Sequence, residues 1–373
     1  MQIHENIYSV RAVDSEIRIF HGYQTPIGTT YNSYLVIDDK ITLIDFVKRP
    51  FADELINNIK TILGDRPIDY IICNHVEPDH SGALPVVVKE YPTAIVYGTM
   101  NCEKELKAYY PDVTYDFVKV KNGDTLSTGK YTFKFLPMPM VHWPDSMATY
   151  LQGEKILFSN DALGQHIGTG EMFDDEISLE HLLDRAGDYY ANIVLPFGMQ
   201  VGKLLETVRG LEIQMICPSH GVILKNHIPQ MVEKYAIWCE NKTNEKKAVI
   251  VFDTMWGTTR KLAQRLNYEY VQNGYSVELI NLSEKHHSYA MARILDAKYI
   301  FVGSPTLNNQ IMPTVSAFLT YMRGLKPKNR IGCAFGSYGW SGESVGQIND
   351  ILTSCGFEML EPIKTMWNVQ GDL

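Results

Sequence analysis

The sequence contains one short run that is dense in metal-binding side chains. His75, Glu77, Asp79 and His80 fall within six residues. They follow the apolar segment 70–73, which predicts a strand, and sites in α/β folds gather where strands end. Alternate residues of an extended backbone point to the same side. His75 and Glu77 are therefore expected to share one metal ion, while Asp79 and His80 address a second.

Three later residues complete a candidate dinuclear site. His142, Asp161 and His220 each follow a predicted strand. If Asp161 bridges the two ions, each ion receives two or three further ligands and keeps open positions for a small substrate. Such a site suits chemistry rather than structural bracing. The predicted metal ligands are His75, Glu77, Asp79, His80, His142, Asp161 and His220.

The ligand types bear on the choice of metal. Glu77 at the second position of the run, and the lack of a cysteine ligand, favour iron or manganese. Zinc also accepts carboxylates, so a dizinc site stays open.

A second constellation predicts a phosphate site. The apolar strand 248–252 runs into the turn 254–259 and then a helix, and the turn carries hydroxyls and one glycine. Free N–H groups at a helix N-terminus bind phosphate. The turn has no lysine, which argues against a nucleoside triphosphate loop, and the absence of GxGxxG argues against a dinucleotide. A single phosphate monoester, as in FMN, fits better.

Two further loops leave the same predicted sheet, at residues 304–309 and 337–342. Their aromatic residues could stack on a flat ring, and their glycines allow close approach of the backbone to ring nitrogens. The candidate FMN-binding residues are Thr254, Met255, Trp256, Gly257, Thr258, Thr259, Pro305, Thr306, Leu307, Asn308, Asn309, Ser337, Tyr338, Gly339, Trp340, Ser341 and Gly342.

The elements around these motifs predict two domains, 1–245 and 246–373, joined by the polar stretch 240–247. The pattern of the first domain predicts an α/β sandwich with antiparallel sheets. The regular alternation of strands and helices in the second predicts a doubly wound parallel sheet. In the first we expect a hairpin over 30–46, strands at 69–73, 94–97, 131–136 and 148–151, and helices at 51–62, 179–191 and 228–239. In the second we expect strands at 248–252, 276–280, 298–303 and 330–336, and helices at 259–273, 289–295, 313–323 and 342–355.

Composition excludes several partners. Thirty-four Lys and Arg against 43 Asp and Glu give a net charge of -9, which repels nucleic acids and acidic membranes. The apolar runs are too short to span a membrane, and the N-terminus lacks a signal-peptide core, so we expect a cytoplasmic protein. The six cysteines form no CxxC pair, which excludes a rubredoxin-like module in this chain. Electrons must then come from outside.

Taken together, these motifs resemble the flavodiiron proteins, also called A-type flavoproteins. The first half resembles the metallo-β-lactamase fold: the seven predicted ligands match the family's positions, and HxExDH is the iron form of the superfamily's HxHxDH. The second half resembles flavodoxin, with the turn 254–259 at the flavin phosphate and the loop 337–342 beside the flavin ring.

The resemblance implies two iron ions and FMN, and reduction of dioxygen to water or of nitric oxide to nitrous oxide. It also implies an external electron donor, such as rubredoxin or a reductase, and a head-to-tail homodimer or a dimer of dimers. In such a homodimer the FMN of one subunit lies beside the irons of the other. In some relatives the residue at His80 turns away from the metal. The chain ends eleven residues after Pro362, before the family's final helix.

Alternatives remain at this point. His21 and Tyr190 are candidates for residues that support the metal ligands, although surface and packing roles explain them as simply. A dizinc hydrolase with an attached flavodoxin-like module is the main functional alternative, and a non-catalytic FMN carrier or gas sensor is another.

Overall fold

The computed structural model describes residues 1–368, and the end of the second predicted domain, 369–373, lies outside the described residues. Contacts within the chain divide it into two compact units. Unit 1 comprises Met1–Arg18, Thr25–Ala186 and Met199–Ala236, and unit 2 comprises Ile19–Gln24, Gly187–Gly198 and the chain from Ile237 onward. No helix within residues 1–368 is long and apolar enough to cross a membrane.

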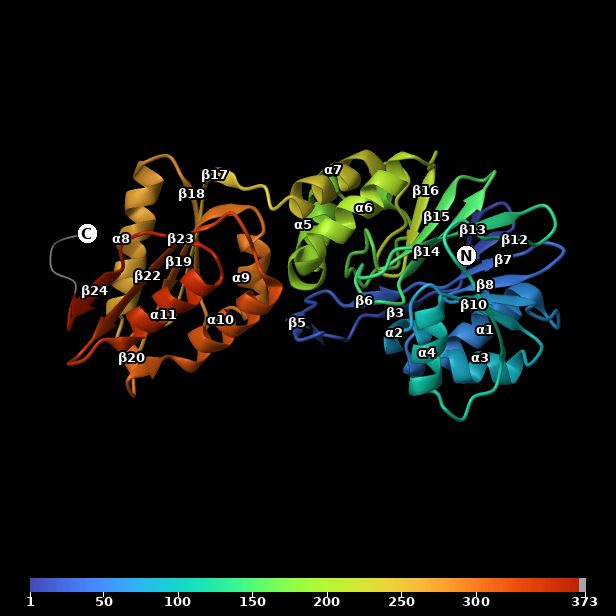
Figure 1. Ribbon diagram of the computed structural model, residues 1–373, viewed down its shortest axis with the longest axis horizontal. Coiled ribbons are helices and arrows are strands. Elements are labelled where there is room, and N and C mark those ends of the chain that lie inside the picture. Colours follow the sequence, from blue (N-terminus) through green and yellow to red (C-terminus); the bar gives the residue numbers. More distant parts are fainter. Residues whose placement is uncertain (369–373) are drawn as a thin grey trace. The chain divides into compact units, whose positions relative to one another are not determined.

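A seven-stranded sheet forms one layer of unit 1 (Figure 1). The hairpin predicted over 30–46 is confirmed, because its two strands pair antiparallel with Tyr34 opposite Ile44. The later strands run parallel, since helices return the chain between them. The expectation of antiparallel sheets is wrong for this part. In spatial order the strands are β1 (Gln2–His4), β2 (Ile7–Ser9), β7 (Tyr34–Val36), β8 (Thr42–Ile44), β9 (Tyr70–Ile72), β10 (Ile95–Gly98) and β11 (Asp116–Lys119).

A five-stranded sheet forms the second layer. Its neighbours are antiparallel except for the last pair, which is parallel. The strands are β12 (Thr125–Ser127), β13 (Thr132–Pro137), β14 (Met147–Gln152), β15 (Ile156–Asn160) and β16 (Met215–Pro218). Two small ribbons stand apart, β3 (Ala12–Asp14) with β6 (Thr29–Tyr31) and β4 (Ile19–Phe20) with β5 (Tyr23–Gln24).

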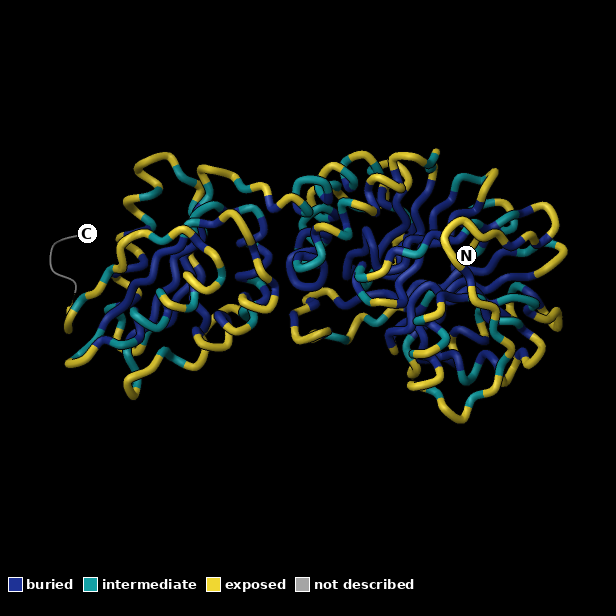
Figure 2. The backbone as a smooth tube through the Cα atoms, in the orientation of Figure 1, coloured by how far each residue is buried: buried dark blue, intermediate teal, exposed yellow. Residues whose placement is uncertain are grey.

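The core of unit 1 lies between the two sheets. Tyr34, Val36 and Ile44 from one sheet share an apolar cluster with Phe133 and Phe158 from the other. Figure 2 shows buried backbone concentrated in these strands. Helices lie outside both layers, so the predicted α/β sandwich is confirmed and its layers follow the order αββα, as in the metallo-β-lactamase fold that the first half resembles. The helices of the first half are α1 (Ala52–Leu63), α2 (Pro78–Ser81), α3 (Leu84–Glu90), α4 (Met100–Tyr109), α5 (Leu179–Tyr189), α6 (Gly198–Arg209) and α7 (Ile228–Cys239), with short turns at Arg49–Phe51, Asp174–Glu176, Tyr190–Val194 and Leu195–Phe197.

Unit 2 is built on a parallel sheet, as predicted. Counted along the chain, its strand order is 2-1-3-4-5, the flavodoxin-like order of a doubly wound sheet. The strands are β18 (Ser276–Asn281), β17 (Asn244–Phe252), β19 (Ala297–Gly303), β22 (Ile331–Tyr338) and β23 (Glu358–Met359), and β24 (Ile363–Met366) also pairs with β22. The helices are α8 (Thr258–Gln272), α9 (His287–Ile294), α10 (Pro313–Leu325) and α11 (Glu343–Ser354).

Two segments from the first half of the chain belong to unit 2. The backbone N–H of Gln24 donates to Ser288 Oγ over 3.1 Å. The Tyr321 hydroxyl donates to Asn192 Oδ1 over 2.9 Å. The carboxylate of Asp188 pairs with Arg293 at 3.1 Å. Unit 2 is therefore not a continuous stretch of sequence.

Two local predictions differ from the structure. Strand β17 begins at Asn244, so the second half of the expected linker is strand, and Lys247 pairs with Ser276. Polar side chains do not prevent this, because the backbone supplies the pairing groups. The loop expected at 304–309 contains the first strand and the turn of a hairpin, β20 (Thr306–Leu307), whose second strand β21 (Gln310–Ile311) follows it. Its turn residues Asn308 and Asn309 have φ of 50° and 59°, a conformation that asparagine tolerates.

Candidate functional site

The run at 75–80 lies between strand β9 and helix α2. His75 occupies the connection and Glu77 directly precedes the helix, while Asp79 and His80 lie within its single turn. All four side chains are buried. The chain changes from an irregular connection to a helix after Glu77. The side chains of His75 and Glu77 therefore point to one place, and those of Asp79 and His80 to another.

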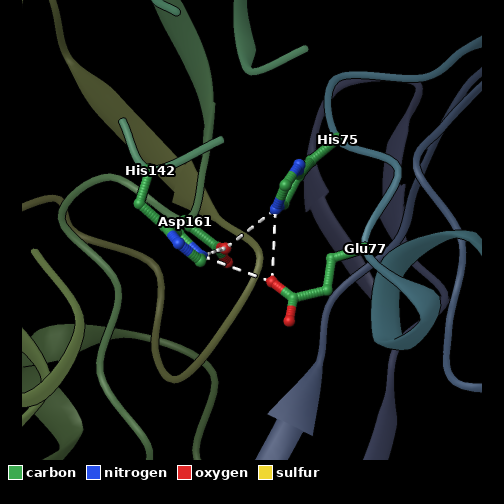
Figure 3. A group of neighbouring side chains, drawn as sticks. All are labelled: His75, Glu77, His142 and Asp161. Carbon is green, nitrogen blue, oxygen red and sulfur yellow. Dashed lines mark hydrogen bonds and ion pairs between the residues drawn. The ribbon is translucent and has the colours of Figure 1, made fainter. Parts of the chain in front are cut away.

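Four ligand-type residues form the first group (Figure 3). Nε2 of His75 lies 3.4 Å from Glu77 Oε2, and Nε2 of His142 lies 3.3 Å from the same oxygen. Oδ2 of Asp161 lies 3.1 Å from His142 Nε2 and 3.5 Å from His75 Nε2. Two imidazoles and two carboxylates thus face one common point.

The second group consists of Asp79, His80 and His220. Oδ2 of Asp79 lies 3.2 Å from His80 Nε2 and 3.1 Å from His220 Nε2. The other oxygen of Asp161, Oδ1, lies 3.0 Å from His80 Nε2 and 3.5 Å from His220 Nε2. One carboxylate therefore joins the two groups, with one oxygen turned to each, and His80 faces the same point as its neighbours.

These distances fit two bound metal ions. Bonds of about 2.0–2.2 Å place neighbouring ligand atoms about 3.0–3.5 Å apart. Within residues 1–368, several ligand atoms are buried and have only ion-pair contacts, without a well-formed hydrogen bond, among them His75 Nε2, His80 Nε2 and Asp79 Oδ2. Buried polar atoms are normally satisfied. A cation at each point would satisfy them.

The far sides of two imidazoles are also held. Nδ1 of His75 lies 3.1 Å from the buried carboxylate of Asp145, which accepts the Val76 N–H at 2.7 Å. Nδ1 of His220 lies 2.6 Å from the carbonyl oxygen of Thr30. Such partners fix the ring orientation and leave Nε2 as the ligand atom.

Carboxylates give the site a field that favours positive charge. Burial lowers the pKa of His80, but Asp79 and Asp161 outweigh it and raise the pKa to about 9. For His75, burial is likewise outweighed, chiefly by Asp145, and its pKa lies well above the usual value. Burial raises the pKa of Asp161, but the surrounding imidazoles hold it well below the usual range. The same carboxylates would stabilise bound metal cations.

In unit 2 a cavity of about 370 Å³ opens among the loops that follow β17, β19 and β22. Thirteen of the predicted FMN-binding residues line it: Met255, Trp256, Thr258, Pro305, Thr306, Leu307, Asn308, Asn309, Ser337, Tyr338, Gly339, Trp340 and Ser341. The other four, Thr254, Gly257, Thr259 and Gly342, are not in the lining. The exposed tryptophans beside an apolar cavity fit a flat ring.

The turn at 254–259 carries the N-terminus of α8. Gly257 precedes the helix at φ 87°, and its N–H donates to Thr254 Oγ1 over 3.0 Å. Thr259 Oγ1 lies 2.8 Å from Ser337 Oγ, which ties the turn to the loop after β22. The glycine leaves open space where a side chain would lie. These features fit a phosphate group at the helix start.

Sequence reasoning missed two residues around these sites. Asp145 lies in the loop before β14, and a single carboxylate three residues after His142 was its only signal. Trp367 follows β24 and lines the cavity in unit 2. The two suggested supporting residues belong to unit 2: exposed His21 stacks on Phe20, and buried Tyr190 packs on Trp238.

Comparison with known proteins matches a family to each half of the chain. Residues 29–221 match the family described as ODP family beta lactamase, and residues 250–372 match Flavodoxin. The solved flavodiiron protein of Giardia intestinalis is similar over 99% of this chain and 91% of its own, with TM-score 0.96 and 35% identity. The chain belongs to the flavodiiron family.

Two relatives of this flavodiiron chain carry names that describe reactions. A nitric oxide reductase of Moorella thermoacetica is 42% identical over 99% of this chain and 94% of its own length. A rubredoxin-oxygen oxidoreductase of Megalodesulfovibrio gigas is 41% identical over 97% of this chain and 92% of its own. The similarity thus spans both units.

Proposed function

We propose that this protein is an oxidoreductase that reduces dioxygen to water, nitric oxide to nitrous oxide, or both. The observation that carries the proposal is the position of Asp161, whose two oxygens face two separate groups of buried ligands. A dinuclear site and a flavin-type cavity carried by the same chain suit multi-electron reduction of a small molecule.

The cofactors define what the chain must hold. When bound, two ferrous ions and reduced FMN supply the four electrons that dioxygen needs, or the two that a pair of nitric oxide molecules needs. His75, Glu77 and His142 would hold one ion, and Asp79, His80 and His220 the other, with Asp161 shared. The loops of unit 2 would hold FMN, with its phosphate at the start of α8.

The chain's own residues position and shield the reaction. Asp145 and the Thr30 carbonyl orient His75 and His220, so both present Nε2 without a change of rotamer. All seven ligand side chains are buried, which limits water around them. A dry, carboxylate-rich site strengthens each electrostatic contact with a bound cation.

Several finer features belong to the same proposal. We propose residues 1–245 as the di-iron domain and 246–373 as the FMN domain, in a cytoplasmic head-to-tail homodimer or a dimer of dimers. An external donor of the rubredoxin type, or a reductase, would deliver electrons to FMN. The names rubredoxin-oxygen oxidoreductase and flavorubredoxin among relatives support such a donor.

The test begins with protein purified without oxygen. We expect about two irons and one FMN per chain, and consumption of dioxygen or nitric oxide after chemical reduction. D161N should lose at least about 100-fold in turnover together with bound iron, because Asp161 alone among the described ligand residues faces both groups. D112N, at an exposed aspartate of unit 1, serves as the matched control.

Two results would contradict the proposal. One is D161N protein with an intact fold and full reductase turnover. The other is parent protein, produced with ample iron, that contains two zinc ions and hydrolyses esters or amides but reduces neither gas. That outcome would favour the dizinc hydrolase.

A further inference from the structure

Trp367 lies where the last strand of unit 2 meets the flavin-type cavity. It directly follows β24, which pairs with β22 in the parallel sheet. The three loops predicted to bind FMN, 254–259, 304–309 and 337–342, do not include it. Its side chain nevertheless lines the cavity together with residues of all three loops.

Three contacts fix the position of Trp367. Its N–H donates to the Tyr338 carbonyl over 3.0 Å. Its own carbonyl accepts the Thr258 hydroxyl over 2.9 Å. Two carbons of the indole lie 3.3 Å from the point where a Cβ would stand on Gly339. Trp367 is thereby attached both to the turn at the start of α8 and to the loop after β22.

The exposure of the aromatic lining points to a ligand. Trp256, Trp340 and Trp367 are 92%, 83% and 66% exposed around one cavity. A single exposed aromatic residue needs no explanation, but several gathered around a concave apolar surface mark a binding site. Aromatic rings prefer other flat π-systems as partners.

We propose that Trp367 is a flavin-binding residue: its indole forms a wall of the ring pocket, and its backbone joins that wall to the phosphate turn. The inference rests on the proposed function, because it takes FMN as the ligand. The two backbone contacts fix the main chain of Trp367 and the indole lies against Gly339, so less conformational freedom is lost when the flavin binds. The expected ligand contact is with the isoalloxazine ring and not with the phosphate.

The test measures binding of FMN and of riboflavin, which lacks the phosphate, to flavin-free protein by quenching of flavin fluorescence. W367A should weaken binding of both ligands by about tenfold. W367F keeps an aromatic wall and should stay within about threefold of the parent. Y268A removes an exposed tyrosine of unit 2 that does not line the cavity, and it should leave both affinities unchanged.

Two outcomes overturn the inference. One is W367A protein that binds both flavins like the parent. The other is W367A protein that loses affinity for FMN alone, which would assign Trp367 only to the phosphate turn. If W367A does not fold, as judged by circular dichroism, W367L replaces it: W367L must bind both flavins at least about fivefold more weakly than W367F.

The same titration separates this inference from the proposed function. A parent protein that binds neither flavin overturns the cofactor assignment and this inference with it. A parent that binds FMN while W367A is unaffected overturns the role of Trp367 alone. Iron content should be equal in the parent, W367A and Y268A, because the metal ligands belong to unit 1.

Discussion

The carboxylate of Asp145 lies 3.1 Å from Nδ1 of His75, while Nε2 of the same ring faces Glu77 and Asp161. The imidazole is therefore held from both ends by acidic groups. Asp145 is fully buried, and burial together with Asp145 raises the pKa of neighbouring Glu105 to about 7. The carboxylate of Asp145, which also accepts the Val76 N–H, is thus part of how His75 is oriented.

Replacing Asp145 should weaken the first iron more than the second. D145N retains one acceptor oxygen and should lower iron affinity at that group by about tenfold, and D145A by about 100-fold. Competition with a coloured chelator measures both values, with D112N as control. Equal affinities in D145A and the parent would show that the carboxylate does not position His75.

His80 should hold iron only in the second group. H80N removes an imidazole that faces Asp79 and Asp161 and leaves the other group intact. We expect bound iron to fall from about two to about one per chain, with one ferrous signal left in Mössbauer spectra. H181N, on helix α5, should retain both ions. Two tightly bound irons in H80N would remove His80 from the ligand set.

Asp45 should make stability depend on pH. Its buried carboxylate accepts the Asn74 backbone N–H at 2.6 Å and side-chain amide at 2.9 Å. Burial outweighs these bonds and raises its pKa to about 6. A raised acid pKa means stability that is full below the unfolded pKa and is lost as pH rises through the folded pKa.

As the pH rises from 4 to 7, we therefore expect the unfolding free energy of the parent to fall by about 2–3 kcal/mol more than that of D45N. Urea unfolding at several pH values measures this difference. D45N also changes the hydrogen bonds to Asn74, so the two proteins can differ in stability by a constant amount at every pH. The decisive quantity is therefore how this difference changes with pH. Parallel pH curves for the two proteins would contradict the prediction.

FMN binding should require glycine at position 339, because a side chain there would meet the indole of Trp367. An alanine Cβ would stand 3.3 Å from the indole and displace it. G339A should therefore weaken FMN binding by about threefold to tenfold. The same change in a W367A background should cost little, because the ring is already gone. An equal loss in both backgrounds would show that Gly339 acts on the flavin independently of Trp367.

Sequence alone predicted the features that local pattern determines. Helix α7 matches the expected range 228–239, since its apolar spacing is regular. The run at 75–80 stood out because four ligand-type residues fall within six positions. Asp145 and Trp367 could not be found this way, since their roles depend on contacts with residues distant in sequence, such as His75 and Thr258. The direction of the strands after β8 likewise follows from how helices return the chain.

The two early segments that belong to unit 2 bear on how this protein can be divided. A gene fragment for residues 246–373 would lack Gln24, Asp188 and Asn192, the partners of Ser288, Arg293 and Tyr321. During synthesis these partners emerge from the ribosome long before helices α9 and α10, which they contact. The flavin-binding half thus uses stretches of chain made well before its own sheet, so transplanting it into another protein would require transferring three separate pieces of chain.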